Sequence, residues 1–430
     1  MREFISRYRI LFAVFGTAVV TLLAVLAVMN FSGAEPHIEK RLERLYAVED
    51  PRFRQELGVL LGPPFVDGNR VRVLRNGDEI FPAMLAAIRG AQKTITFESY
   101  IYWSGDIGRE FGEALAERAR AGVRTHVLLD WIGSSKMDEE IIKAMETAGV
   151  EVHKFHPPHW YHLQRMNNRT HRKLLVVDGK RAFTGGVGIA PEWTGNAESP
   201  ERWRDTHFQV EGPVVAQIQA VFLDNWIKVT GQVLHGEPYF AELEDVGQSA
   251  AQMFSSSPTG GAESMQLMYL LSITSAARTI DLSASYFVPD ELMLRALVEA
   301  MKRGVRLRIV VPGEHIDAET VRLASRAQWG PLLEAGAVIA EYGPTMYHCK
   351  VLIIDDLLVS VGSTNFDNRS FRLNDEATLN ILDVRFAKEQ TAIFEADLAR
   401  SRPISHQEWL NRPLQERLAE KVASLIDSQL

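Results

Sequence analysis

Short apolar runs alternate with amphipathic stretches along most of the chain, from about Val71 onward. In the amphipathic stretches the apolar residues recur every three to four positions, which is typical of helices, whereas the short runs are typical of buried strands. This alternation predicts an α/β fold. The preceding residues 35–65 combine a charged helical pattern with a proline- and glycine-rich stretch, and we expect a helix and a linker there.

One unit of this pattern occurs twice. Residues 93–130 and 278–313 share the order strand, loop with an aromatic residue and an aspartate, helix, and second strand. Repeats of this length indicate duplicated domains and not the units of a solenoid. We therefore predict two similar domains, residues 66–243 and 265–400, that face each other across a pseudo-twofold axis. The Ser- and Gly-rich residues 244–264 are expected to be the linker, with room for one strand.

An uncharged run of twenty residues, 10–29, lies near the start of the chain. As a helix it would be about 30 Å long, which matches the hydrocarbon thickness of a bilayer. We expect an uncleaved transmembrane anchor within residues 1–34, with a cleaved signal peptide as the alternative. Arg2, Arg7 and Arg9 precede the run, and basic residues favour the cytoplasmic side. A single pass would then place the rest of the chain outside the cytoplasm.

The last segment, residues 401–430, predicts an amphipathic helix. Its apolar stripe consists of Leu414, Leu418, Val422 and Leu425. Packing of this stripe against the second domain is the favoured interpretation, and contact with a membrane surface is the alternative.

Composition and charge narrow the classes of function. The chain is 46% hydrophobic and 24% charged, as folded proteins are, and its formal net charge is −8. Because nucleic-acid-binding proteins are usually basic, no nucleic-acid partner is expected. Any phosphate site must be a local cluster of cationic groups in an acidic protein. The single cysteine, Cys349, excludes an intramolecular disulfide.

Two motifs each place a histidine and a lysine two positions apart at the start of an apolar run. They have identical spacing and comprise His171, Lys173 and Asp178 in THRKLLVVDG (170–179), and His348, Lys350 and Asp355 in YHCKVLIIDD (347–356). Alternate side chains of a strand share a face, so each histidine should point the same way as its lysine. One such motif is often accidental, whereas two inside a repeated unit favour a functional site.

The aspartates of the two motifs require a separate interpretation. Asp178 lies seven residues after His171, an odd offset that excludes it from the same strand face. Asp178 and Gly179 also form a common hairpin-turn pair. We therefore interpret Asp178 as a carboxylate that locks a turn, and Asp355 occupies the same position in the second motif.

Small residues follow each aspartate after six intervening positions: Gly185 and Gly186 in the first half, Gly362 and Ser363 in the second. Glycine permits close approach of the backbone to a ligand. Ser363 and Asn365 can donate hydrogen bonds to phosphate oxygens. Gly186, Ser363 and Asn365 are therefore candidate substrate-binding residues.

These duplicated motifs resemble the hallmark of the phospholipase D superfamily, H-x-K-x4-D-x6-G-G/S. The resemblance covers about residues 70–430 and is strongest to the bacterial cardiolipin synthases, on segments such as ESYIYWSGDIG, WRDTHFQVEGP and VGSTNFDNRSFRLNDE. It implies two tandem α/β/α sandwich domains. Many relatives have Asn where this chain has Gly188, whereas the second half keeps Asn365, so we expect the halves to bind phosphate unequally.

The resemblance also implies a reaction, in which phosphatidylglycerol gives a phosphatidyl-enzyme that a second phosphatidylglycerol converts to cardiolipin with release of glycerol. By analogy His171 is the nucleophile that forms a phosphohistidine and His348 is the acid and base, although pseudo-symmetry leaves the reverse assignment open. Lys173 and Lys350 would hold the non-bridging phosphate oxygens. No metal or other cofactor is expected.

Two further sets of residues have competing interpretations. Asp205 in WRDTH and Glu376 in LNDEA are candidates to orient the histidines, and solvated surface carboxylates are the alternative. The second set recurs every three residues and comprises His153, His156, His159 and His162. Two prolines break any helix that would align these histidines for a metal, so a loop whose Trp160 and Tyr161 touch lipid headgroups is favoured.

Three classes of function compete. A lipid acceptor makes the protein a phosphatidyltransferase of a bacterial inner membrane with an extracytoplasmic catalytic part. Water as the acceptor makes it a phospholipase D or a nuclease, which the acidic balance and the expected anchor disfavour. A membrane scaffold without activity is disfavoured by the two intact motifs. The choice between alcohol and water depends on the shape and dryness of the pocket, which spacing does not encode.

Overall fold

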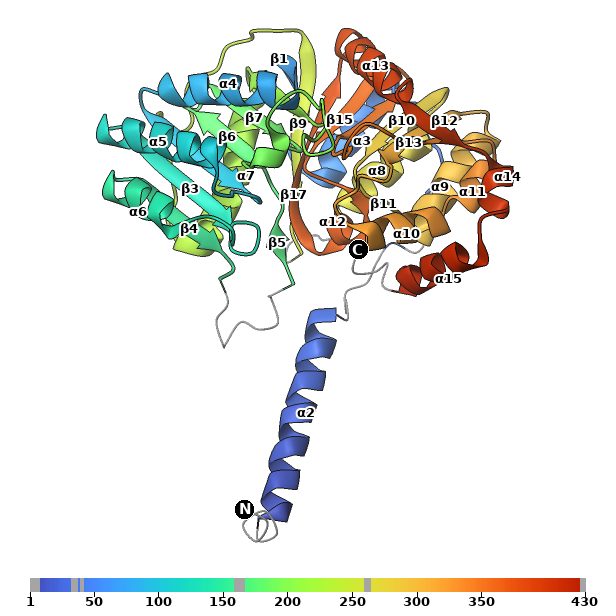
Figure 1. Cartoon of the computed structure of the whole chain (residues 1–430). Helices are drawn as coiled ribbons and strands as arrows, with labels where there is room; N and C mark the ends of the chain where they lie inside the picture. Colours follow the sequence, from blue (N-terminus) through green and yellow to red (C-terminus); the bar gives the residue numbers. More distant parts are fainter. Residues whose placement is uncertain (1–7, 32–37, 39–41, 158–166, 259–263, 426–430) are drawn as a thin grey trace.

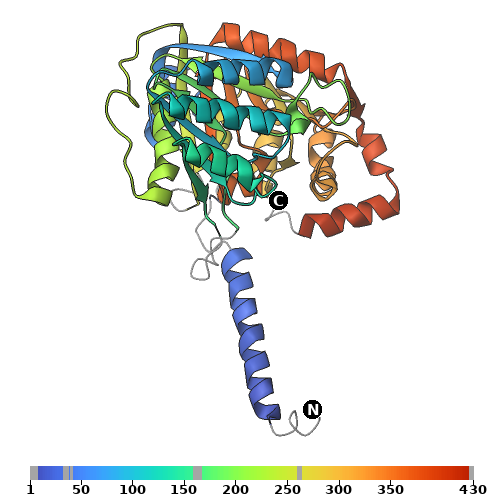
Figure 2. The same ribbon diagram turned by 60° about the vertical axis from the view of Figure 1, so that its left-hand side comes forward.

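The structure is a computed structural model that describes residues 8–31, 38, 42–157, 167–258 and 264–425 (Figure 1). The strands of these residues form a 16-stranded sheet and a separate two-stranded pairing. Helices lie on both faces of the large sheet, which confirms the α/β class and the expected pair of tandem domains (Figures 1 and 2).

The N-terminal region contains α2 (Arg9–Phe31) and α3 (Pro51–Leu61). The first half contains β1 (Val66–Arg75), α4 (Asn76–Arg89), β2 (Thr94–Ser99), α5 (Asp106–Arg120), β3 (Arg124–Asp130), α6 (Glu139–Thr147), β4 (Glu151–Phe155), β5 (Arg169–Thr170), β6 (Leu174–Val177), β7 (Arg181–Gly185), η2 (Pro191–Trp193), β8 (Thr206–Glu211) and α7 (Val215–Thr230).

The second half begins with β9 (Ser249–Ser256), α8 (Ser264–Ser275), β10 (Thr279–Ala284), β11 (Phe287–Val288), α9 (Glu291–Lys302), β12 (Arg306–Pro312), α10 (Glu319–Ala327), α11 (Gly330–Glu334) and β13 (Val338–Tyr342). It continues with β14 (Lys350–Ile354), β15 (Leu358–Gly362), β16 (Phe366–Asp367), α12 (Asn368–Arg372), β17 (Asn374–Leu382), α13 (Val384–Leu398), β18 (Ser401–Ile404), α14 (His406–Leu410) and α15 (Leu414–Ala423).

The repeated unit has the same strand pairing in both halves. β2 pairs in parallel with β3 and antiparallel with β6, and β10 pairs in the same way with β12 and β14. This pairing confirms the predicted duplication. It also gives β6 and β14, which follow the two histidines, equivalent places in the sheet.

The segment expected to be a linker contains β9, which joins the halves. β9 pairs antiparallel with both β1 and β17, at the centre of the sheet. Its sequence, SAAQMFSS, is almost entirely buried. Small residues therefore serve here to fit a crowded central strand and not to form a flexible connection.

One hydrophobic core crosses the boundary between the halves. It includes Phe222 and Trp226 of α7 together with Phe386 and Phe394 of α13. Burial of large aromatic side chains provides much of the stability of a core. The halves are therefore packed as one body, and the cavity described below lies at a rigid junction.

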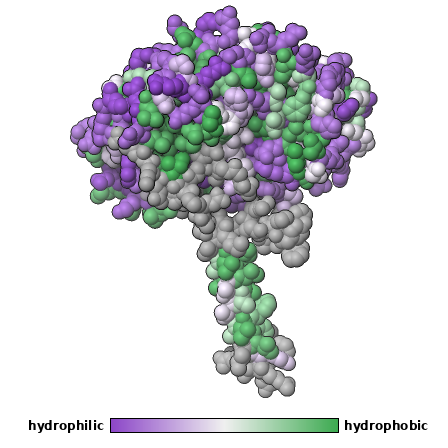
Figure 3. All heavy atoms as spheres, turned by 180° about the vertical axis from the view of Figure 1, so that it is seen from behind, coloured by the Kyte–Doolittle hydropathy of each residue, from purple (hydrophilic) through white to green (hydrophobic). Residues whose placement is uncertain are grey.

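The N-terminal helix α2 stands apart from the globular body (Figures 1 and 2). Large apolar side chains of its described part are exposed (Figure 3), including Leu11, Phe15 and Val20. Within the described residues, no helix reaches both the length and the apolarity required to cross a membrane. The transmembrane anchor expected at residues 10–29 is thus not shown by the structure.

The C-terminal helix α15 packs against the body with its polar side. Glu420 is 1% exposed and forms ion pairs with Arg326 at 3.3 Å and Arg412 at 2.7 Å. The apolar stripe faces outward, with Leu414, Leu418, Val422 and Leu425 exposed by 77%, 66%, 58% and 78%. The favoured interpretation, in which this stripe packs against the second domain, is wrong because buried ion pairs hold the opposite face.

Candidate active site

Residues of both halves line a cavity of about 450 Å³ that includes His171, Lys173 and His348. The strands begin at Leu174 and Lys350, so both histidines precede them. Each histidine backbone is held instead by the opposite half. His171 N donates to the carbonyl oxygen of Asp375 at 2.9 Å, and His348 N donates to that of Arg204 at 2.8 Å.

The histidine side chains are held by crossed carboxylates. His171 Nδ1 lies 2.9 Å from Glu376 Oε1, which belongs to the second half. His348 Nδ1 lies 2.7 Å from Asp205 Oδ2, which belongs to the first half. The two candidate orienting carboxylates are therefore fully buried partners of the histidines and not solvated surface groups. Each half completes the histidine of the other.

Side chains surround the Glu376 carboxylate. It accepts hydrogen bonds from the hydroxyls of Ser363 and Ser370 and, at 3.3 Å, from Asn374 Nδ2, in addition to His171. Ser363 is completely buried, so its hydroxyl is committed to Glu376 and is not presented to the cavity. The expectation that Ser363 binds phosphate directly is corrected: it supports the carboxylate.

The Asp205 carboxylate has different neighbours. It accepts from Trp193 Nε1 at 2.9 Å and from the backbone N–H of Thr206 at 2.8 Å, in addition to His348. A Cβ atom on Gly186 would lie 2.4 Å from Asp205 Oδ1. Gly186 is thus required to make room for the carboxylate, and its expected contact with substrate is corrected in the same way.

Burial favours the neutral form of both imidazoles in the free enzyme. It lowers the pKa of His171 to about 4, against the opposing effect of Glu376. Burial and the charge of Lys350 lower the pKa of His348 to about 3. Burial alone would raise the pKa values of the carboxyl groups, but the neighbouring imidazoles and lysines lower that of Asp205 and bring that of Glu376 to about 2.

The ionisation states determine the tautomers. A carboxylate only accepts hydrogen bonds, so the proton of each neutral imidazole resides on Nδ1. Nε2 of His171 and of His348 then carries the lone pair. A neutral imidazole of this tautomer is a competent nucleophile or general base.

Both lysines are buried beside their own histidines. Lys173 Nζ donates to the carbonyl oxygen of His171 at 2.7 Å. Lys350 Nζ donates to the carbonyl oxygen of His348 at 2.9 Å and to Ser285 Oγ at 2.6 Å. Burial lowers the pKa of both ammonium groups, that of Lys173 to about 7. An anion between them would restore their preference for the charged state.

Gly188 and Asn365, which occupy equivalent positions of the two halves, have different surroundings. Asn365 lines the cavity and its Oδ1 accepts from Ser285 Oγ at 2.8 Å. A Cβ atom on Gly188 would lie 2.8 Å from Ile101 Cβ and 3.2 Å from Trp193, so this position has no room for an amide. At this pair of positions, the second half offers an amide to the cavity and the first half does not.

The motif aspartates lie outside the cavity lining and close turns. Asp178 accepts from the backbone N–H groups of residues 92, 93 and 94, and Asp355 accepts from those of residues 277, 278 and 279. Both have positive φ angles, 54° and 55°. The interpretation of Asp178 as a turn-locking carboxylate agrees with this geometry, and Asp355 has the same role.

Aromatic residues of the cavity were not singled out from the sequence. The Tyr100 ring is edge-on to His171 at 5.0 Å, and Trp193 and Trp203 lie 5.2 and 5.5 Å from the His348 ring. The second repeat also contributes a tyrosine to the cavity, Tyr286, which lies one position further along the repeat than Tyr100. The aromatic residue in the loop of each repeat was the available sequence signal for these side chains. That these loops lie beside the histidines depends on how the strands are arranged.

The region of the recurring histidines is only partly described. His159, His162, Trp160 and Tyr161 lie outside the described residues, while His153 packs edge-on against Trp226. Across the described ranges, no group of three or more His, Cys, Asp or Glu side chains is placed to hold a metal ion.

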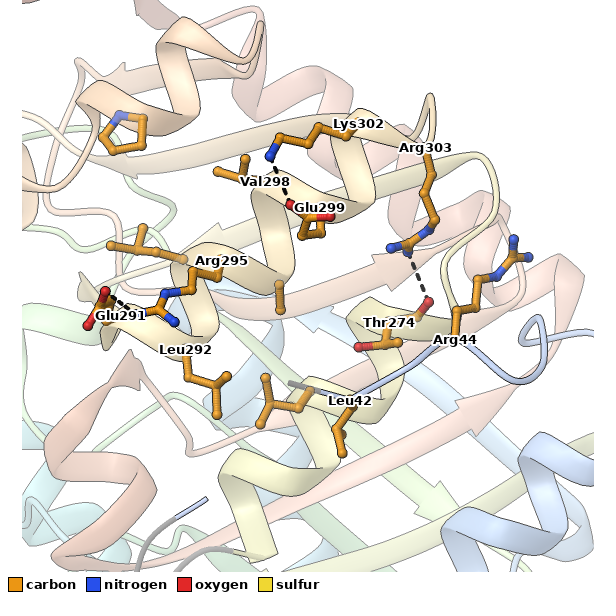
Figure 4. A pocket seen from close by; sticks show the side chains of 14 residues that line it. Leu42, Arg44, Thr274, Glu291, Leu292, Arg295, Val298, Glu299, Lys302 and Arg303 are labelled. Carbon is orange, nitrogen blue, oxygen red and sulfur yellow. Dashed lines mark hydrogen bonds and ion pairs between the residues drawn. The ribbon is translucent and has the colours of Figure 1, made fainter. Parts of the chain in front are cut away.

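A larger cavity of about 560 Å³ lies elsewhere, beside α8 and α9 (Figure 4). The charged groups on α9 and directly after it are engaged with neighbours: Arg295 pairs with Glu291, Lys302 pairs with Glu299 at 2.9 Å, and Arg303 donates to a carbonyl oxygen of α8. It contains no histidine. Size alone therefore does not identify the reactive site, whereas the donor set of the smaller cavity does.

Comparison with known proteins agrees with this geometry. The chain matches the family described as "Cardiolipin synthase, PLD-like domain" over residues 84–226 and 269–398. It is 35% identical over 396 residues to a cardiolipin synthase of Geobacillus sp. (strain WCH70), covering 91% of this chain and 79% of that protein. It is also 35% identical over 367 residues to cardiolipin synthase A of Pseudomonas fluorescens, covering 84% and 75%.

A solved structure extends the likeness to the fold. Phosphatidylserine synthase of Haemophilus influenzae aligns with a TM-score of 0.67 at 15% identity, covering 88% of this chain and 99% of that chain. The paired α/β units and the two His–Lys motifs define an enzyme of the phospholipase D-like class. Within that class, the chain belongs to the cardiolipin synthase, PLD-like domain family.

Proposed function

We propose that the protein is a phosphatidyltransferase that makes cardiolipin from two phosphatidylglycerol molecules and releases glycerol. The observation that carries this proposal is the pair of buried imidazoles, each hydrogen-bonded to a carboxylate of the opposite half, beside two buried lysines. This set supplies a nucleophile, a proton donor and a clamp for negative charge. Its relatives are named cardiolipin synthases, which suggests the lipid substrate.

The first step forms the covalent intermediate. His171 Nε2 attacks the phosphorus of one phosphatidylglycerol, and the bond from phosphorus to the glycerol oxygen breaks. His348 donates a proton to that oxygen. The anionic diester offsets the field of Lys350, which contributes to the low pKa of His348, so substrate binding favours the protonated imidazole. Lys173 and Lys350 stabilise the charge that develops on the non-bridging oxygens.

The second step transfers the phosphatidyl group. The headgroup hydroxyl of a second phosphatidylglycerol loses its proton to His348 and attacks the phosphorus. The new bond from oxygen to phosphorus forms as the bond to His171 Nε2 breaks. The products are cardiolipin and a neutral His171, and His348 again carries the proton needed for the next cycle.

Two exposed apolar surfaces support attachment to a bacterial inner membrane. The apolar side chains of α2 and the stripe of α15 are both exposed, and the two helices lie toward the same end of the molecule as β5 and α12, whose residues line the cavity (Figure 1). In this proposal α2 anchors the chain in a single pass, with the catalytic part extracytoplasmic and α15 resting on the lipid surface.

The full-length protein, supplied with phosphatidylglycerol alone, tests the reaction. Cardiolipin and glycerol should accumulate in equal amounts. Accumulation of phosphatidic acid without cardiolipin would show that water is the acceptor and would overturn the proposal.

An alkaline phosphatase fused after residue 430 tests the topology. The fusion should be active if the catalytic part is extracytoplasmic, and an inactive fusion in a stable protein would contradict that topology.

A further inference from the structure

Two arginines, Arg169 and Arg369, line the cavity and have no part in the two steps above. Arg169 lies in β5 of the first half and Arg369 in α12 of the second. Both are of intermediate exposure, so neither is a fully solvated surface charge. Each half thus contributes one guanidinium group to the same cavity.

Contacts between the halves fix the positions of both arginines. β5 pairs with the start of β17, where Arg169 lies opposite Asn374. Arg369 Nη2 donates to the carbonyl oxygen and to Oδ1 of Asn167 at 2.8 and 3.1 Å. Because Asn167 lies two residues before Arg169, the two arginines are held to the same short segment.

The two positive charges act on each other. Burial lowers the pKa of Arg169, the Asp130 carboxylate opposes this change, and the charge of Arg369 adds to the lowering. The Asp130 carboxylate also accepts three backbone N–H groups. An anion placed between the guanidinium groups would relieve their repulsion, and guanidinium groups match phosphate geometry well.

Tyr100 connects this pair to the reacting centre. Its ring lies 5.0 Å from the His171 ring, with Lys173 Nζ 5.4 Å from the ring centroid. The charges of Arg169 and Arg369 act on the ionisation of the Tyr100 hydroxyl, at the other end of that side chain. Tyr100 thus borders both the reacting histidine and the arginine pair.

We propose that Arg169 and Arg369 form a second phosphodiester site, which holds the phosphate of the acceptor lipid. This inference rests on the proposed function, in which the acceptor is a second phosphatidylglycerol. Held there, the acceptor places its headgroup hydroxyl beside the phosphorus on His171. Water has no phosphate to bind, so the arginine pair favours transfer of the phosphatidyl group over hydrolysis.

The experiment compares two acceptors in the full-length enzyme with phosphatidylglycerol in detergent micelles. Cardiolipin formation requires an acceptor with a phosphate, whereas exchange of radiolabelled free glycerol into phosphatidylglycerol does not. Arg169→Gln and Arg369→Gln should each lower cardiolipin formation about 10- to 100-fold, as expected for loss of a charge-assisted hydrogen bond. Glycerol exchange should stay within about threefold of the unmodified enzyme, and Arg369→Lys should recover part of the loss.

Arg120→Gln, at an exposed position of α5, is the matched control and should change neither reaction. A parallel fall of both reactions in the arginine variants would show a role in donor binding or folding and would overturn the inference alone. Unchanged cardiolipin formation would also overturn it. If the unmodified enzyme exchanges glycerol but makes no cardiolipin, the proposed function fails together with the inference.

Discussion

The two halves of the cavity have the same arrangement of groups around the histidine but differ in the residues that provide them. In each, a histidine preceding a strand receives a carboxylate and a backbone carbonyl oxygen from the opposite half. His171 is held by a glutamate, Glu376, and His348 by a shorter aspartate, Asp205. Neither half can therefore orient its own histidine, which gives a physical reason for the two units to be packed as one body.

The small residue that ends each motif differs between the halves, and so does the carboxylate beside it: Ser363 lies beside Glu376, and Gly186 lies beside Asp205. Ser363 donates its hydroxyl to Glu376, whereas Gly186 leaves the space that Asp205 occupies. The same motif position thus supports a carboxylate in both halves, by a hydrogen bond in one and by absence of a side chain in the other. The difference teaches that this position governs the orientation of the histidine supplied by the opposite half.

The largest expected effect separates the chemical roles of the two histidines. His171→Ala should remove the nucleophile, so no labelled protein should form from radiolabelled phosphatidylglycerol. His348→Ala keeps the nucleophile but loses the proton donor and acceptor, a change that typically costs about 10²- to 10⁴-fold. That variant should form an acid-labile, base-stable phosphohistidine slowly and then retain it.

The opposite labelling pattern would reverse the assignment of the halves. Label retained by His171→Ala and absent from His348→Ala would make His348 the nucleophile. Absence of label from both variants and from the unmodified protein under rapid quenching would contradict a covalent intermediate. Thermal unfolding of each variant provides the control for loss of structure.

A smaller effect is expected at the two supporting positions. Gly186→Ala places a Cβ atom where the Asp205 carboxylate lies, so His348 should lose its partner. Because loss of an orienting carboxylate can lower turnover by several orders of magnitude, we expect a fall in kcat of about 10²- to 10³-fold. Ser363→Ala removes one of several hydrogen bonds to Glu376, and a fall of about tenfold is expected.

The difference between the falls in kcat of Gly186→Ala and Ser363→Ala tests whether the two positions support their carboxylates in different ways. Gly362→Ala is unsuitable as a control, because its Cβ would lie 2.2 Å from a backbone oxygen. Ser363→Gly is the matched control, since it changes the second half toward the first without adding atoms. An equal, small fall for Gly186→Ala and Ser363→Ala would contradict the steric role assigned to Gly186.

Sequence patterns predicted those features that depend on spacing along one strand. The duplicated unit, both His–Lys pairs and the turn at Asp178 follow from the offsets of residues in short segments. The crossing of Glu376 and Asp205 depends on how the strands of the two halves meet, and no local pattern encodes it. Ser363 was misassigned for the same reason, because its partner comes from another strand.

Patterns of composition and periodicity were ambiguous in two other places. Small residues in β9 resembled a linker because a crowded central strand also selects small side chains. The apolar stripe of α15 was correctly placed on one helical face, but periodicity does not show which face is covered. The ion pairs of the buried Glu420 hold the polar face of α15 against the body, so the apolar face is exposed.

The smallest expected effect concerns the lysines and the pH dependence of kcat/KM, which reports ionisations of the free enzyme. Activity should fall as the pH decreases through about 4, where His171 gains a proton. It should also fall as the pH rises, because the proton donor His348 has a pKa of about 3 in the free enzyme. This decline should steepen by about tenfold per pH unit above about 7, where Lys173 loses its proton and the clamp loses a charge.

Arginine substitutions show which lysine, Lys173 or Lys350, causes the alkaline limb of the pH profile of kcat/KM. Arg keeps its charge over this range, so Lys173→Arg should move the limb upward whatever it does to the maximal rate. Lys350→Arg is the matched substitution in the other half and should leave the limb near its original position. If Lys350→Arg moves the limb and Lys173→Arg does not, the titrating lysine is Lys350, and the second half, not the first, contains the ammonium group with the lower pKa.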